Sequence, residues 1–395
     1  MLCRDLITLT FSAFSIERWN DHPRTLHLTE MDKQAHKAMI AWALGQKAAD
    51  EHRDVSWPTL IEGGLFEFYR RVQLTDLKPP VFHKLMADPK RRHQLNEWVY
   101  AQVEAPLKLL QPTLAERAKA WYQAPDPWAE RLLTAAHFLA SRWEFQFVEP
   151  LSRPLADTAA IKAQLDDQVR EFEDLPGVTE AMTEGSDLST FISLIGQLRF
   201  QKRWAQTARV PETSVLGHLL MVAHLAYYLS LEMGLGAARR VNNFYCGLWH
   251  DLPEVLTRDI ISPVKRSVDG LEDLIKELEE ESMASSIYPL IPERWSETLR
   301  YYTVDEFKNR YRYDGHVHLV DGDLNQGHDD VIYDAVDGEL IEACDKFAAY
   351  VEATESIRLG MAATSLVEGR RRIEEKFRKK QLQGYPLSAL FDLYS

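Results

Sequence analysis

The chain has 395 residues, and its 46 Lys and Arg residues against 60 Asp and Glu residues give a formal net charge of −14. This length exceeds that of one typical domain, so we expect two domains. So acidic a chain lacks the clustered basic surface that polymeric nucleic acid requires, although a metal and a few local cations can still hold a small phosphorylated substrate.

The N-terminal stretch MLCRDLITLTFSAFSIERW carries Arg4 and Asp5 early and has no small-residue cleavage site, so we expect no signal peptide. The three cysteines are far apart and form no Cys-x-x-Cys motif, which fits a reducing cytoplasm. The longest apolar stretch, LLMVAHLAYYLSLEM, is interrupted by His224 and Glu232 and is too short to span a bilayer. We therefore expect a cytoplasmic protein without membrane contact.

Most of the chain shows the apolar periodicity of helices. Residues 213–234 place apolar side chains at steps of three and four, with Thr213 or Ser214 available to cap the start and Gly234 to end the helix. Residues 242–259 predict a second buried helix, which stops before the next Ser-Pro pair.

Two further helices are expected at 271–287 and 339–363, the first amphipathic and the second with one apolar face. Before the second of them, residues 311–338 are rich in Gly and Asp and contain the short apolar runs HVHLV and VIY, which we interpret as strands of a hairpin-like insertion. The predicted fold class is therefore all-α, with this small insertion in the second half.

The two halves of the chain resemble each other. Residues 63–81 align with 246–264 through shared Gly, Leu, Val, Asp and Pro positions, and an Arg-Trp pair lies upstream of each segment. Further downstream, the segment around His137 aligns with the segment around Asp345. Three matches in the same order predict two copies of one helical domain, with shared helical composition as the alternative explanation.

We place the two domains at 1–180 and 188–395, joined near the Pro- and Gly-bearing stretch EDLPGVTEAMTEGSD. In this alignment His36 falls opposite His218. Two such copies can pack together as the subunits of a dimer do, which predicts a pseudo-dimer within the chain and leaves homo-oligomers open.

The copies differ at the positions that carry ligand chemistry. The first copy has Glu67 and Phe68 where the second has His250 and Asp251. A phenylalanine cannot bind a metal ion, so we expect the first copy to have lost the chemistry while keeping the packing.

Four residues of the second copy have the side chains of a metal site. His250 and Asp251 are adjacent in a predicted buried helix, and imidazole and carboxylate groups bind divalent metals such as Mn, Fe, Co, Ni or Zn. His218 on the preceding predicted helix and Asp345 on a later one can supply the remaining ligands.

This order of ligands, His … His-Asp … Asp on separate helices, resembles that of the HD-domain metal phosphohydrolases. The stretch HDLPEVLTRDIISPVK is similar to that of the bacterial HD-domain 5′-deoxynucleotidases, which carry the pattern HDxxEVxxxDxxxPVK, and the pair Arg203 and Trp204 also matches. The resemblance covers residues 188–355. The chain departs from the family at Gly217, where the family usually has Glu, and by the additional segment 311–338.

The resemblance implies metal-assisted hydrolysis of a phosphate monoester, with a nucleoside (deoxy) 5′-monophosphate as the substrate. One divalent ion, which the sequence limits only to Mn, Co, Ni, Fe, Mg or Zn, would be held by His218, His250, Asp251 and Asp345 and would lower the pKa of a bound water. Glu254 would be the general base or acid, because it lies one predicted helical turn from His250 and Asp251.

Four further residues have implied roles at the substrate. Asp259 would position the sugar hydroxyl or assist proton transfer, Arg203 would contact the phosphate with its forked donors, and Lys265 would add positive charge. Trp204 would pack against the sugar and favour deoxyribose. A structural role stays open for three of them, because Asp259 can cap the next turn and the first copy keeps the Arg-Trp pair.

Two other functions remain open at this point. The same metal site can hydrolyse a nucleoside triphosphate or a signalling nucleotide, and a non-enzymatic protein can bind metal and nucleotide in order to regulate a partner. The presence of Glu254 close to the ligands favours an enzyme.

Overall fold

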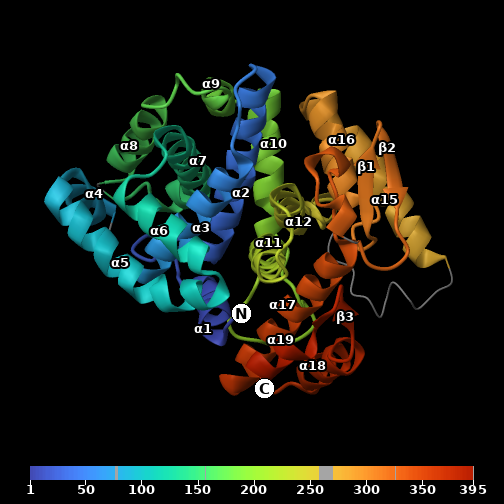
Figure 1. Ribbon diagram of the computed structural model, residues 1–395. Helices are drawn as coiled ribbons and strands as arrows, with labels where there is room; N and C mark the ends of the chain where they lie inside the picture. The colour runs from blue at the N-terminus through green and yellow to red at the C-terminus, as the bar shows by residue number, and fades with distance from the viewer. Residues whose placement is uncertain (76–78, 156, 258–269, 325, 395) are drawn as a thin grey trace. The chain divides into compact units, whose positions relative to one another are not determined.

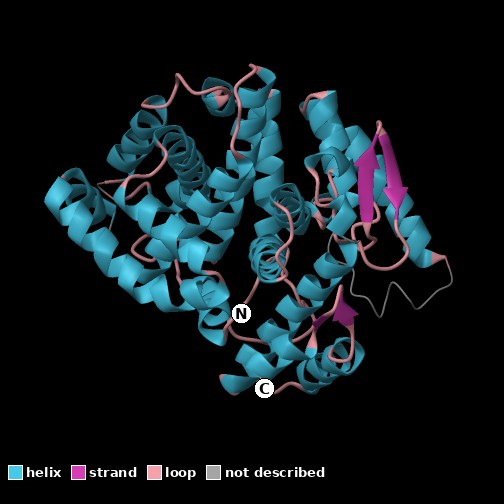
Figure 2. Cartoon of the chain, in the orientation of Figure 1, coloured by secondary structure: helices cyan, strands magenta, loops and turns pink. Residues whose placement is uncertain are grey.

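The computed structural model describes residues 1–75, 79–155, 157–257, 270–324 and 326–394. Helices dominate these residues (Figure 2), and the strands named among them form two short antiparallel pairs. The predicted all-α class is therefore confirmed.

The chain divides into two compact units. The first comprises Met1–Pro176 and Tyr227–Leu235, and the second comprises Gly177–Ala226 and Gly236–Ser395. Helix α11 (Val215–Glu232) therefore contributes its N-terminal part to the second unit and its C-terminal end to the first.

The first unit is built from helices whose starts are marked in the sequence. Proline occupies the first turn of several of them, and the side chains of Asp88 and Asp126 accept backbone N–H groups at two helix starts. Helix α7 packs against α2 and α3 (Figure 1). The elements are α1 (Arg4–Ser12), η1 (Ala13–Ser15), α2 (Glu30–Asp50), α3 (Trp57–Gln73), α4 (Pro79–Ala87), α5 (Pro89–Leu110), α6 (Pro112–Gln123), α7 (Pro127–Ser152) and α8 (Thr158–Arg170).

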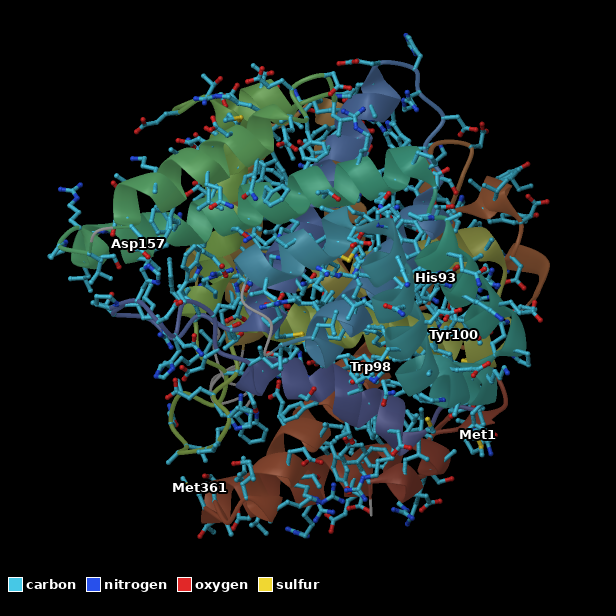
Figure 3. All side chains as sticks on the ribbon, turned by 90° about the vertical axis from the view of Figure 1, so that its left-hand side faces the viewer. Met1, His93, Trp98, Tyr100, Asp157 and Met361 are labelled. Carbon is cyan, nitrogen blue, oxygen red and sulfur yellow. The ribbon has the colours of Figure 1, made fainter. Side chains whose placement is uncertain are left out.

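The core of the first unit contains large aromatic side chains. Trp42 on α2 and Tyr69 on α3 are fully buried, and the hydroxyl groups of Tyr69 and Tyr228 lie 2.7 Å apart, so each buried hydroxyl has a partner. Figure 3 shows α5 with His93, Trp98 and Tyr100, of which Trp98 is 48 % exposed.

The second unit contains the remaining helices and both strand pairs. Helix α12 packs against α16 and α17, so the segment that ends at Trp249 is held from two sides. The helices predicted at 271–287 and 339–363 are present as α15 and α17, although α17 ends five residues earlier than predicted, at Arg358. The elements other than α11 are α9 (Val178–Met182), α10 (Asp187–Gly196), η2 (Gln197–Phe200), α12 (Ala237–Trp249), α13 (Glu254–Thr257), α15 (Leu271–Ser286), η3 (Tyr288–Leu290), α16 (Glu293–Thr303), β1 (Arg310–Tyr313), β2 (His316–Leu319), η4 (Gln326–His328), η5 (Val331–Tyr333), α17 (Gly338–Arg358), α18 (Thr364–Phe377), β3 (Gln381–Leu382), β4 (Tyr385–Pro386) and α19 (Ser388–Leu393).

Helix α11 begins and ends as the sequence predicts. The hydroxyl of Ser214 accepts the backbone N–H of Gly217 at 2.9 Å, and Gly234 takes a left-handed φ of 69° just after the last turn. The expectation that this stretch is too short for a membrane needs correction, because by length and composition alone α11 could cross one. However, 94 % of that window is buried inside the structure, as in an ordinary core helix.

The single helix predicted at 242–259 is wrong, because the structure has two helices separated by a turn. Helix α12 ends at Trp249, and α13 begins at Glu254. Pro253 explains the break, since it has no backbone N–H and disfavours a helical conformation in the residue before it. The chain tightens here, and the N–H of Leu252 reaches back only three residues, to the carbonyl of Trp249 at 2.8 Å.

The hairpin-like insertion is present, but one of its predicted strands is wrong. Residues 316–319 pair with Arg310–Tyr313, whereas the run Val331–Tyr333 forms a short 3₁₀ helix. Asp314 and Gly315 both take positive φ, 49° and 76°, which is the backbone of a tight two-residue hairpin turn. Aspartate and glycine tolerate this conformation. The turn therefore pairs residues 316–319 with the strand directly before it, and the later run Val331–Tyr333 is left out of the hairpin.

Candidate metal centre

The four predicted metal ligands lie together in the second unit. One donor atom from each of His218, His250 and Asp251 lies within 4.8 Å of the other two. Oδ1 of Asp345 lies 2.9 Å from Nε2 of His218. The side chains come from α11, from the turn after α12 and from α17, so three segments distant in sequence converge on one point.

Close packing between α11 and α12 brings the two histidines near each other. A Cβ atom on Gly247 would lie only 2.9 Å from the Cα atom of Ala223, so only glycine permits this approach of the two backbones. The ring centroids of His218 and His250 are 6.2 Å apart.

The end of α12 orients His250. Its Nδ1 atom lies 2.9 Å from the carbonyl oxygen of Gly247, which fixes Nδ1–H as the donor. The Nε2 atom then points its lone pair toward Asp251, whose Oδ2 is 3.3 Å away. The helix break is therefore part of the site, because it places both side chains in the turn directly after α12.

A buried carboxylate orients His218 in the same way. Its Nδ1 atom lies 3.2 Å from Oε1 of Glu352, a fully buried residue on α17, while Nε2 faces Asp345. A histidine whose Nδ1–H donates to a carboxylate presents Nε2 to a metal.

This donor set fits a divalent cation. Two histidines present Nε2 with Nδ1 already bonded elsewhere, and Asp251 and Asp345 add two carboxylates. Such a mixture of imidazole and carboxylate suits Mn, Fe, Co, Ni or Zn, and it does not select one of them.

The charges at the site keep both aspartates ionised. Burial opposes the charge of Asp251, but the adjacent His250 outweighs it and lowers the pKa of Asp251 to about 2. Burial likewise opposes the charge of Asp345, yet Lys346 and His218 hold the pKa of Asp345 well below its usual range. The two carboxylates are therefore anionic at neutral pH and attract a cation.

Glu254 is buried at the start of α13, immediately after the turn that carries two of the ligands. Its backbone N–H donates to the carbonyl of Asp251 at 3.1 Å, and its own carbonyl accepts the side-chain amide of Gln201. The prediction that Glu254 follows His250 by one turn of a continuous helix is corrected by the break at Pro253.

Arg203 and Trp204 lie in the turn between η2 and α11. Arg203 approaches two acidic residues of the site, with Nη2 at 3.8 Å from Asp345 and Nε at 3.5 Å from Glu352. The indole N–H of Trp204 donates to Glu352 at 2.9 Å, and its ring packs so closely on α18 that a Cβ on Gly369 would lie 2.9 Å from it. Arg203 thus lies beside the proposed ligand Asp345, whereas Trp204 fills the space between its own turn and helix α18.

The two remaining predicted residues, Asp259 and Lys265, lie outside the described residues. Their proposed roles as a proton-transfer or sugar-positioning group and as a source of positive charge therefore stay predictions.

Sequence reasoning missed three polar residues at this site. Glu352 follows Asp345 by two helical turns, a spacing that could have shown that the two share a face of α17. Lys346 lies directly after Asp345, and its Nζ is 2.6 Å from Oδ2 of that residue. Glu306 carries no sequence signal. Burial and, to a lesser degree, the charge of Asp251 raise its pKa.

Comparison with known protein families matches residues 195–374 to the HD domain. This domain indicates the metal-dependent phosphohydrolase family, whose members bind divalent metals. The matched range contains all four predicted ligands together with Glu254 and Glu352. A search of curated proteins returned no match.

Proposed function

We propose that the second unit, with its HD domain at residues 195–374, hydrolyses a phosphate monoester and that its substrate is a nucleoside (deoxy) 5′-monophosphate. The observation that carries this proposal is the arrangement of the two histidines. Each has its Nδ1 tied to a fixed acceptor, so both Nε2 atoms face the carboxylates of Asp251 and Asp345.

His218, His250, Asp251 and Asp345 would hold a divalent ion, which would supply Lewis acidity toward the phosphate and lower the pKa of water. Glu254 moves the proton of the attacking water or of the leaving oxygen, since it is a buried acid three residues after Asp251.

Two cations at the site are suited to bind the phosphate group. Lys346 is paired with Asp345 and has 31 % of its side chain exposed, so it can reach a ligand from the edge of the site. Arg203 adds a forked donor at 3.8 Å from the same carboxylate. Neither is a metal ligand, so each can contact the substrate while Asp345 binds the ion.

The nucleotide part of the proposal rests on the stretch around His250 and on the pair Arg203 and Trp204, which resemble the 5′-deoxynucleotidases. The hairpin β1–β2 is additional to that pattern. It is therefore the feature that can give this chain a substrate other than that of the 5′-deoxynucleotidases.

Phosphate release by the purified protein tests the function. Nucleoside mono- and triphosphates are supplied with Mn²⁺, Co²⁺, Ni²⁺ or Mg²⁺, beside Asp251→Ala and the exposed control Asp50→Ala. Release of inorganic phosphate from monophosphates that is lost in Asp251→Ala but kept in Asp50→Ala supports the proposal. Release of pyrophosphate or tripolyphosphate instead shows a triphosphate hydrolase, and metal binding without any cleavage favours a regulatory protein.

A further inference from the structure

A turn of the same construction precedes α2 in the first unit and α11 in the second. Trp19 and Trp204 take φ of 57° and 56°, in the left-handed region that tryptophan rarely adopts. In each turn an antiparallel bridge joins the residue two positions before the tryptophan to the residue that caps the following helix. The bridges join Glu17 to Thr29 and Lys202 to Ser214.

Each of the two tryptophans donates its indole N–H to a buried glutamate on a later helix. Nε1 of Trp19 lies 3.2 Å from Glu144 on α7, and Nε1 of Trp204 lies 2.9 Å from Glu352 on α17. The arginine before each tryptophan approaches the same carboxylate, with Nε at 2.8 Å in the first unit and 3.5 Å in the second. Such a set of matching contacts is not explained by shared helical composition.

These shared contacts give a residue-by-residue register for the two units. Lys33 follows its left-handed tryptophan by the same number of residues as His218, and His137 precedes its buried glutamate by the same number as Asp345. The two positions touch in both units: Nζ of Lys33 contacts Nδ1 of His137, and Nε2 of His218 lies 2.9 Å from Oδ1 of Asp345. His36, which the sequence alignment set opposite His218, lies three residues after Lys33 on α2. In the register of the shared contacts, Lys33 and not His36 therefore matches His218.

We propose that the first unit is a copy of the metal-binding fold in which the amino group of Lys33 takes the place of the metal ion. The first unit then binds no metal, and the chain binds one divalent ion through the second unit. The count of one ion rests on the metal site proposed above, whereas the role of Lys33 does not.

The other ligand positions of the first unit also lack a metal-binding arrangement. Phe68, which the alignment sets opposite Asp251, is buried and offers no donor atom. Glu67, opposite His250, is held in an ion pair with the buried Lys37. A carboxylate already paired with an internal ammonium is a poor ligand for a second cation.

The surroundings of Lys33 are those of a buried amino group, because burial holds the pKa of Lys33 well below its usual range and Glu30 only partly opposes this shift. The side chain is fully buried, and Nζ lies 3.9 Å from Oε1 of Glu30. Glu30 in turn accepts Arg18 at 2.9 Å and Arg71 at 3.1 Å. Burial and the neighbouring Lys33 hold the pKa of His137 well below its usual range, so Nδ1 of its neutral ring accepts a hydrogen bond from Lys33. A divalent ion here would have to displace these cations.

Counting bound metal tests the proposal directly. The protein is loaded with Mn²⁺, freed of excess ion, and assayed for manganese per chain, beside Asp251→Ala. We expect one ion in the native protein and none in Asp251→Ala. Two ions in the native protein would place a metal in the first unit and overturn the proposal.

Chemical rescue tests the role of Lys33 itself. Lys33→Ala leaves a cavity beside buried carboxylates, and we expect its melting temperature to fall by roughly 5–15 °C, as when a buried pair loses one partner. Methylammonium or ethylammonium should restore part of that loss. Lys33→Met, which fills the cavity without charge, should be destabilised but should not respond to the amine. The exposed control Lys119→Ala should match the native protein.

The outcomes separate this proposal from the proposed function. A native protein without metal, combined with amine rescue of Lys33→Ala, removes the metal site of the second unit and keeps the role of Lys33. An unchanged melting temperature in Lys33→Ala, or a destabilised Lys33→Ala that no amine restores, overturns the role of Lys33 whatever the enzyme does. If Lys33→Ala does not fold, the metal count of the native protein decides.

Discussion

Nδ1 of His218 lies 3.2 Å from Oε1 of Glu352, a fully buried carboxylate two helical turns after Asp345. The same carboxylate accepts the indole N–H of Trp204 and lies 3.7 Å from the buried guanidinium of Arg209. Glu352 thus fixes the orientation of His218, a proposed metal ligand, and also the turn that precedes its helix. It is a positioning residue, since it acts on the metal only through His218.

Replacing Glu352 by Gln should weaken metal binding rather than chemistry. A hydrogen-bonded carboxylate behind a metal-binding histidine contributes roughly 10–100-fold to metal affinity. We expect the Mn²⁺ dissociation constant of Glu352→Gln to rise by about that factor, and kcat to recover when Mn²⁺ is raised to saturation. Isothermal titration and phosphate-release assays measure the two quantities separately.

The first unit supplies a matched control for this change. Glu144 accepts the same kind of indole and guanidinium donors, at 3.2 Å and 2.8 Å, but lies in the unit without the ligand set. Glu144→Gln should therefore lower the melting temperature without changing metal affinity. Equal losses of metal affinity in the two variants would show that Glu352 acts only on the fold.

Apolar periodicity and capping residues predicted much of this fold. The limits of α11 follow from Ser214 and Gly234, and α15 and α17 appear where amphipathic patterns predict them. The four proposed ligands were identified from their residue types and from an order that resembles that of the HD-domain phosphohydrolases, and buried His and Asp side chains must in any case find polar partners.

The missed features depend on tertiary contacts. Pro253 ends α12 early, but periodicity runs through the break because the buried side chains on both sides belong to one core. Glu352 looks like an ordinary helical glutamate until His218 and Trp204, which are distant in sequence, meet it. Only the fold reveals that its carboxylate is buried.

Lys346 should matter for the substrate and not for the metal. Its Nζ is 2.6 Å from Asp345, and that charge raises the pKa of Lys346, so it remains a cation at neutral pH. Loss of one charged hydrogen bond to phosphate costs about 1.5–3 kcal/mol, so Lys346→Met should lower kcat/KM by roughly 10–100-fold, mainly through KM. Metal affinity should stay equal or increase, because Asp345 loses a competing cation. The exposed Lys308→Met should leave both quantities unchanged, and a loss of metal affinity in Lys346→Met would contradict this assignment.

Metal and proton should compete for His250. Burial disfavours its protonated ring, but Asp251 and Asp345 outweigh burial and raise the pKa of His250 above 6.5. A raised histidine pKa stabilises the metal-free fold below 6.5, and this stabilisation is lost as the pH rises through the folded value. With a chelator, the melting temperature should therefore fall as the pH rises above 6.5, whereas with limiting Mn²⁺ it should rise because the proton is easier to displace.

The variant His250→Ala checks that this titration belongs to His250. In this variant, the fall in melting temperature with a chelator and its rise with limiting Mn²⁺ should both disappear. His224 should not contribute, because burial lowers the pKa of His224 to about 3 and the ring stays neutral across this range. Parallel slopes with and without metal would contradict the competition.

Glu30 should make the first unit sensitive to acid. Burial opposes its charge, but Arg18 and Lys33 outweigh burial and hold the pKa of Glu30 below its ordinary value of 4.5. A carboxylate with a lowered folded pKa stabilises the fold above its unfolded value, and this contribution is lost as the pH falls. Glu30→Gln should therefore melt well below the native protein near neutral pH, and the difference should shrink as the pH falls through 4.5 and below. Circular dichroism melts of the two proteins over that range measure the difference, and a gap that stays constant in acid would show that the carboxylate charge is not what stabilises the first unit.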